Sequence, residues 1–169
     1  MKSSKKILKD SLLFRDVYIT GNTSSLHQDF DPKYVLNLDS LYVQTFSFID
    51  RHEIVGIKDA DSGKEKKIFR SYFEFGARWL SDTEEGEDSP TLDDSTKKED
   101  TRTVRATIEA SIVSEYVLLQ EFDEETLIKY ATDELSIEVW PFWREFLISQ
   151  ISRMHLTGVK MPTRKKITS

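Results

Sequence analysis

Apolar and polar residues alternate with a period of two in four stretches of the chain, which predicts four β-strands. The clearest alternation lies in residues 104–119, where aliphatic side chains share one face: Val104, Ala106, Ile108, Ala110 and Ile112. The other predicted strands are residues 11–20, 34–49 and 68–80, and the second continues irregularly through 51–57. In the third, large apolar residues share one face: Phe69, Phe73, Phe75, Ala77 and Trp79.

After residue 123 the spacing of apolar residues changes to that of an α-helix. The acidic run at 123–125 predicts the start of a first helix, because carboxylates stabilise the N-terminal end of a helix. After a break near Ser136, a second helix is predicted to begin just before Pro141, which lacks an amide proton, and to end near Gly158. Its apolar stripe is predicted to contain Val139, Trp143, Phe146, Leu147, Ile151 and Met154.

Four strands followed by two helices predict an α+β domain, in which the two helices pack on one face of a four-stranded antiparallel sheet. The domain is expected to span residues 11–162. Residues 81–101 contain many acids, a single leucine and no aromatic residue, so we expect them to form a disordered acidic loop. Residues 1–10 and 163–169 are predicted to be basic tails, the first of them mobile.

The charge balance and the absence of cysteine exclude several classes of protein. With 24 Lys and Arg against 30 Asp and Glu, the net charge is −6, whereas a nucleic-acid binder needs a basic face. The lack of cysteine excludes disulfides and Cys-based zinc sites. No apolar run reaches the roughly 20 residues that span a bilayer. The N-terminus is not a convincing secretory signal, so we expect a cytoplasmic protein without membrane insertion.

The chain contains no motif that indicates catalysis, a metal site or a cofactor site. Phosphate-binding glycine motifs are absent, and His52-Glu53 opens a zinc-protease motif whose second histidine position holds Gly56. The three histidines are scattered, and the carboxylates do not pair across a predicted cleft. We therefore expect a protein that is not an enzyme and that uses no metal and no cofactor.

Aromatic residues near the start of the second predicted helix are more numerous than one helix face can bury. Trp140 and Phe142 neighbour Trp143 in sequence and therefore point in other directions. One interpretation assigns these rings to the core and to a subunit interface, and the other assigns part of them to a groove for an apolar ligand. Because apolar residues occupy both predicted faces of the sheet, we expect an oligomer that covers the second face.

The chain resembles the SecB family of export chaperones, most specifically in this last helix. Residues 139–145, Val-Trp-Pro-Phe-Trp-Arg-Glu, are similar to the family's aromatic-Pro opening, and residues 151–154, Ile-Ser-Arg-Met, are similar to the end of its helix. Residues 159–162 resemble the extended segment that follows the helix. Residues 16–19 resemble the first strand, and residues 108–112 resemble an alternating interface strand. The resemblance covers roughly residues 12–162.

This resemblance implies an ATP-independent holdase that assembles as a homotetramer, a dimer of dimers, and binds unfolded polypeptides in an apolar groove. The resemblance implies that this groove is lined by Phe46, Phe48, Trp140, Trp143, Phe146 and Leu147, and that the oligomer interface contains Ile108, Ala110 and Ile112. Asp16 and Glu109 match two acidic positions that contact the SecA translocation motor in the family, whereas Thr20 stands where another acid is expected.

Three functions remain open at this point. A general holdase would deliver many preproteins for export. A dedicated SecB-like chaperone would protect one client, such as the antitoxin of a toxin–antitoxin system, and a non-enzymatic adaptor would use the groove for one folded partner. Broad suppression of aggregation favours the first function, binding limited to one short apolar segment favours the second, and binding only to a folded partner favours the third.

Overall fold

Four long strands form one antiparallel sheet. The computed structural model describes residues 4–58, 60–82, 102–164 and 167. The sheet has the order β1-β4-β3-β2 and is built from β1 (Leu12–Leu26), β2 (Tyr42–Lys58), β3 (Glu65–Ser81) and β4 (Thr103–Leu118). The inner strands β3 and β4 carry most of the buried strand residues, and β1 and β2 are the two edges.

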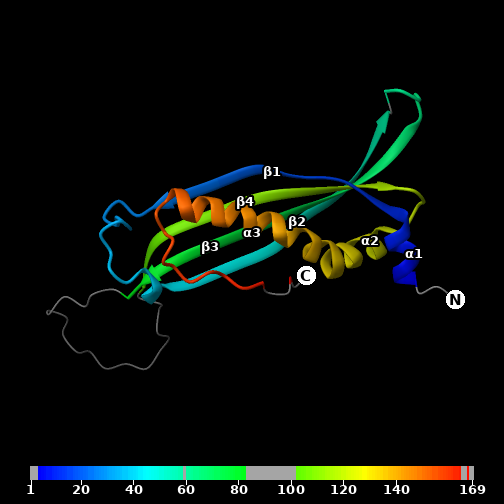
Figure 1. Ribbon diagram of the computed structural model, residues 1–169. Coiled ribbons are helices and arrows are strands. Elements are labelled where there is room, and N and C mark those ends of the chain that lie inside the picture. Colours follow the sequence, from blue (N-terminus) through cyan, green and yellow to red (C-terminus); the bar gives the residue numbers. More distant parts are fainter. Residues whose placement is uncertain (1–3, 59, 83–101, 165–166, 168–169) are drawn as a thin grey trace, which may run out of the picture.

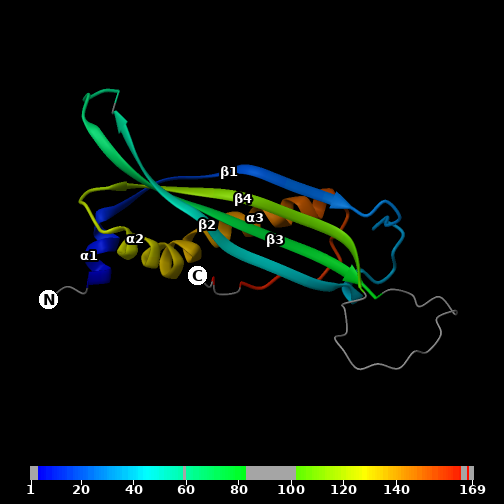
Figure 2. The ribbon, with the colours of Figure 1, turned by 180° about the vertical axis from the view of Figure 1, so that it is seen from behind.

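The helices lie on one face of this sheet (Figure 1), and the other face is left open (Figure 2). Asp123 caps the N-terminus of α2 (Glu124–Tyr130), and its carboxylate accepts a hydrogen bond of 2.8 Å from the Thr126 amide. α2 continues through a π-helical turn (Ala131–Leu135) into α3 (Ser136–Arg153), which runs along the sheet. The predicted α+β architecture, with its helices on one face of an antiparallel sheet, is confirmed.

Pro141 lies inside α3, so the prediction that this helix begins just before the proline is wrong. The break predicted near Ser136 is instead the π-helical turn, which keeps the chain helical from α2 onward. Val139 and Trp143, on either side of the proline, are buried in the core. This packing outweighs the one backbone hydrogen bond that a proline cannot donate.

α3 ends at Arg153, earlier than the predicted stop at Gly158. His155 adopts a left-handed backbone conformation there, with φ 57°, in the place that glycine most often takes after a helix. Gly158 has a different role, because a Cβ added to it would lie 3.2 Å from the Cβ of Leu38. Glycine at this position lets two loops approach each other closely.

The predicted apolar stripe of α3 packs on the sheet and forms the centre of the core. Trp143 stacks on Phe75 of β3 with the ring centroids 5.5 Å apart, and Trp140 meets the same ring edge-on. The buried members of the stripe are Val139, Trp143, Leu147 and Ile151, and Phe146 and Met154 are partly buried against them. The aromatic face predicted for β3 is buried under this stripe, which confirms both patterns.

Ile108, Ala110 and Ile112 of β4 belong to the same core, so their predicted place in an oligomer interface is wrong. Each of the three is at most 2% exposed within the single chain. α3 covers this face of the sheet, and too little of these side chains is exposed to form an interface with another subunit. The alternation that suggested an interface strand therefore reflects burial under the protein's own helix.

Two segments differ from the structure predicted for them. α1 (Ser4–Ser11) takes up most of the tail predicted to be mobile at residues 1–10, and its Leu8 is buried against the core. Residues 34–41, predicted as the start of the second strand, form a loop with a short 3₁₀ helix, η1 (Leu38–Ser40). The Ser40 hydroxyl and amide both donate to the Asn37 carbonyl, and such local turn bonds outweigh the alternating pattern.

Two further predicted segments lie mostly outside the described residues. Of the predicted acidic loop at 81–101, the structure describes Ser81, which ends β3, and Asp82. Of the predicted tail at 163–169, it describes residues 163, 164 and 167, and Ile167 is buried against the core.

Phe46 of β2 covers Gly76 of β3 on the face of the sheet that is turned away from α3. The two residues are paired across the strands, and a Cβ added to Gly76 would lie 2.0 Å from the Phe46 ring. The ring reaches this position because glycine has no side chain. Phe75 and Ala77, on either side of Gly76, point into the core, so Phe46 must lie on the opposite face.

Gly76→Ala should lower the free energy of unfolding by about 1 kcal/mol, because the new methyl group displaces the Phe46 ring. In a Phe46→Ala background the same substitution should have no destabilising effect, because the ring is absent. Chemical denaturation of the wild type, both single variants and the double variant measures this coupling. Equal effects of Gly76→Ala in the two backgrounds would place the ring elsewhere.

Candidate functional site

The four α3 residues predicted to line a client groove lie in two environments. Trp143 and Leu147 are 2% and 1% exposed and belong to the core, so they do not line an open groove. Trp140 and Phe146 are partly buried at the margin of the core. Of the four, Phe146 lines an open pocket.

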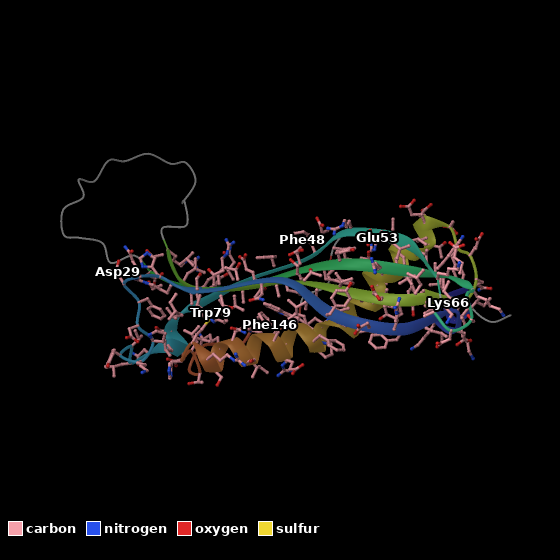
Figure 3. The ribbon with its side chains drawn as sticks, turned by 90° about the horizontal axis from the view of Figure 1, so that it is seen from above. Asp29, Phe48, Glu53, Lys66, Trp79 and Phe146 are labelled. Atoms are coloured by element: carbon pink, nitrogen blue, oxygen red, sulfur yellow. The ribbon has the colours of Figure 1, made fainter. Side chains whose placement is uncertain are left out.

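Phe46 and Phe48, predicted to complete the same groove, lie on the other face of the sheet. Phe48 pairs with Glu74 of β3, and its ring centroid is 6.0 Å from that of Phe46. Figure 3 shows Phe48 on one side of the sheet and Phe146 on the other, towards α3. One chain therefore does not form a groove that combines these phenylalanines with α3, and the prediction of a single groove is corrected.

An open pocket of about 360 Å³ lies between β1 and α3. It is lined by Val17, Tyr18, Ile19, Ile112, Phe142, Glu145, Phe146 and Ser149. Phe142 is 41% exposed and Ile19 is 40% exposed, so apolar surface there is accessible to solvent. Leu13 and Phe14, on the same edge strand, are also exposed. The β1 margin of the sheet is therefore an apolar surface that the described residues leave uncovered.

A larger open pocket of about 490 Å³ lies between β2 and the segment that follows α3. It is lined by Val43, Thr45, Lys160, Met161, Pro162 and Thr163. Trp79 holds this segment in place, since its indole N–H donates a hydrogen bond of 3.1 Å to the Lys160 carbonyl while the ring is fully buried. Figure 3 shows Trp79 on the α3 side of the sheet.

The open face of the sheet carries a network of charged and aromatic side chains. Glu115 of β4 is 5% exposed and accepts hydrogen bonds of 2.7 Å from the Arg70 guanidinium and 3.2 Å from the Tyr18 hydroxyl. Arg70 also reaches Glu53 of β2 at 3.3 Å, and the Tyr72 hydroxyl donates to the same Glu53 carboxylate. Burial, aided by the Glu115 carboxylate, raises the pKa of Tyr18. The hydrogen bond from Tyr72 lowers the pKa of Glu53.

This network changes the expectation that the second face of the sheet is apolar. Its acids and guanidinium groups are paired with one another, so this face does not require a second subunit to cover it. Asp16 and Glu109 both lie on this face, where Asp16 pairs in register with Glu115 and Glu109 forms an ion pair of 2.9 Å with Arg78. Their contact with SecA stays a prediction.

His52 of β2 lies in a third pocket, of about 210 Å³, beside the start of α2. Its ring stacks on Phe69 with the centroids 5.5 Å apart, and Nδ1 is 3.0 Å from the Ser71 hydroxyl. Burial lowers the pKa of His52 from its ordinary value near 6.5, and the Glu124 carboxylate partly opposes this effect. In the part of the chain that the structure describes, no group of three or more His, Cys, Asp or Glu side chains is arranged to hold a metal ion.

The lowered pKa of His52 makes stability depend on pH. Below about pH 6.5 the unfolded chain takes up a proton at this histidine more readily than the folded chain does. Stability should therefore fall as the pH is lowered from 7 to 5, and His52→Gln should flatten this slope. Thermal unfolding at several pH values measures it, and His155→Asn, at an exposed site with a left-handed backbone, is the control. An unchanged slope in His52→Gln would contradict the assignment.

Sequence reasoning missed the pocket beside β2 and the polar network on the open face. Residues 159–162 gave one signal for the pocket, because they resemble an extended segment. How close this segment lies to β2 depends on the tertiary structure, which a local sequence pattern does not contain. The network left a signal in the alternating charges of β3 and β4, where Arg70 and Glu115 face each other in register. None of the described helices is long and apolar enough to cross a membrane.

A four-stranded antiparallel sheet covered on one face by a long C-terminal helix is also the fold of a SecB-like chaperone. One solved structure to which the chain is similar is a SecB-like chaperone of Mycobacterium tuberculosis in complex with a ChAD peptide from the HigA1 antitoxin. The likeness covers 96% of this chain and 94% of that chain, with a TM-score of 0.56 and 14% sequence identity. It confirms the fold that the sequence resemblance implies. No protein-family model and no curated protein matches the chain.

Proposed function

We propose that this protein is a cytoplasmic, ATP-independent holdase chaperone that binds non-native polypeptide segments at the apolar margins of its sheet. The observation that carries the proposal is the likeness of its fold, over nearly the whole chain, to a SecB-like chaperone. The open pockets beside β1 and β2 support it, because both contain apolar side chains that the part of the chain described by the structure leaves uncovered. The broad form of this function is the delivery of preproteins for export.

Burial of apolar client side chains supplies the binding energy in this proposal. One buried aliphatic or aromatic side chain contributes about 1.5–3 kcal/mol. A few such contacts, after the loss of client freedom is subtracted, give affinities on the order of micromolar. Such binding needs no chemical step, so neither a nucleotide nor a metal is required for capture or release.

A second candidate is a chaperone dedicated to one client, such as the antitoxin of a toxin–antitoxin system. The observation that favours it is that the M. tuberculosis protein of the same fold was solved with a peptide from an antitoxin. In this case binding would be limited to one short segment. The adaptor for a folded partner is the remaining alternative, and it would bind no unfolded chain.

If the broad export role holds, Asp16→Asn with Glu109→Gln should weaken binding to SecA.

The wild-type protein should suppress the aggregation of a chemically unfolded client that is diluted into buffer without nucleotide. Phe142→Ser with Phe146→Ser should reduce suppression, because it removes apolar surface beside α3. Leu36→Ser, at a loop residue that is 97% exposed and lines neither pocket, should leave suppression intact. Light scattering follows the reaction. No suppression by a tenfold excess of wild type would exclude the general holdase and favour the dedicated or adaptor functions.

We further propose a homotetramer, a dimer of dimers, that uses the exposed apolar residues of β1. Leu13 is 49% exposed and Ile19 is 40% exposed on this edge strand, whereas the β4 residues first assigned to the interface are buried. Light scattering should give the mass of a tetramer at micromolar concentration. Leu13→Glu with Ile19→Glu should reduce that mass, and Leu36→Glu should not. A monomeric wild type would refute the proposal.

A further inference from the structure

β2 is an edge strand, so half of its backbone hydrogen-bonding groups face away from the sheet. It pairs with β3 alone, and its register runs without a shift through residues 42–49. Within the described residues, no backbone hydrogen bond from outside the sheet reaches this segment. A regular strand edge that nothing covers is a template for an added strand.

β1, the other edge, is a poorer template for an added strand. Its register with β4 shifts twice, after Phe14 and after Ile19. Such irregularities twist an edge and interrupt its row of hydrogen-bonding groups. The register of β2 with β3 shifts once, after Ile49, where the regular segment ends. The two edges therefore differ in the kind of partner that they suit.

Apolar surface flanks the regular segment of β2 on both faces of the sheet. On the α3 side lies the pocket of about 490 Å³, whose lining includes Val43 and Met161. On the open face lie Phe46 and Phe48, and Phe48 is 45% exposed. Successive side chains of an added strand point to opposite faces, so they would meet the pocket and the phenylalanine pair in turn. A strand that is apolar on one face would fill one side and leave the other empty.

Lys160 gives the pocket a charge preference. It lines the pocket and is exposed, and among the described residues no carboxylate forms an ion pair with it. No acidic residue lines the same pocket. A carboxylate in a bound segment would therefore be attracted here, whereas a lysine or arginine would be repelled.

We propose that β2 binds its client as an added strand, with the client segment extended, apolar on both faces and carrying one carboxylate that reaches Lys160. This inference rests on the proposed function and states where and how the client binds. Backbone hydrogen bonds along residues 42–49 hold an extended chain of any sequence, and the pocket and the phenylalanine pair select apolar side chains. A folded protein has no free extended segment to offer.

The first test separates strand addition from binding by side chains alone. The probe is an acetylated and amidated nine-residue peptide of valine and phenylalanine with one glutamate, made also in two forms whose alternate backbone amides are N-methylated. An added strand donates every second amide to β2, so one methylated form should bind about tenfold more weakly and the other should bind almost unchanged. Isothermal titration calorimetry with the wild-type chain measures all three affinities. Equal affinities of the two methylated forms would overturn strand addition.

The second test locates the binding site. Val43→Asp places a carboxylate in the pocket and should weaken the peptide about tenfold, whereas Ile148→Asp, at an exposed site on α3, should leave its affinity unchanged. Lys160→Glu should weaken the glutamate peptide about threefold and strengthen a lysine-substituted peptide by a similar factor. Affinities that respond to neither Val43→Asp nor Lys160→Glu would overturn β2 as the site. Circular dichroism checks that each variant is folded.

The outcomes also separate this inference from the proposed function. If the wild type suppresses aggregation, but peptide affinity depends neither on which amides are methylated nor on Val43, the holdase function stands and strand addition at β2 is overturned. If the wild type neither suppresses aggregation nor binds the peptide, both are overturned. Suppression together with a dependence on amide position and on Val43 supports both.

Discussion

The packing of α3 on the sheet is the interaction on which the rest of the structure depends. Trp143 stacks on Phe75 with the ring centroids 5.5 Å apart, and Val139 and Leu147 extend the same row, almost fully buried. Truncation of one such side chain typically removes about 2–5 kcal/mol, a large part of the stability of a domain this size. Because this row closes one face, the accessible apolar side chains of the sheet lie mainly at its two margins, where β1 and β2 end the hydrogen-bonded ladder.

The features that the sequence predicted correctly depend on local patterns of residues. The features that it predicted wrongly depend on contacts between distant parts of the chain. Alternation along β3 and helical spacing along α3 depend on neighbouring residues, so they identified both elements and their buried faces. Whether Phe46 points towards α3 or away from it depends on the register of β2 with β3, which no local pattern contains. In the same way, an alternating strand containing Ile108 looks identical whether its own helix or a second subunit covers it. Pro141 lies inside α3 because the packing of this helix on the sheet outweighs the low helix propensity of proline.

The polar network limits where an apolar segment can bind. Arg70 lies between Glu53 and Glu115, and two tyrosine hydroxyls donate to these carboxylates. Covering such a group with apolar side chains would remove water from paired charges without replacing its hydrogen bonds, which is unfavourable. The centre of the open face is therefore protected from non-specific association. The Phe46–Phe48 pair lies beside this centre, on the edge strand β2, and stays available to an apolar segment.

Under the proposed holdase function, binding along a margin would explain how capture without nucleotide can distinguish an unfolded chain from a folded one. Holding one residue of a flexible chain in an extended conformation is unfavourable by about 1–2 kcal/mol, which is comparable to the gain from burying one apolar side chain. The balance becomes favourable when several consecutive residues contribute both a backbone hydrogen bond and a buried side chain. A native protein offers few such residues, because its apolar side chains and strand edges are already occupied. In the proposed function, a client that folds would therefore withdraw the groups that held it, and release would follow from folding itself.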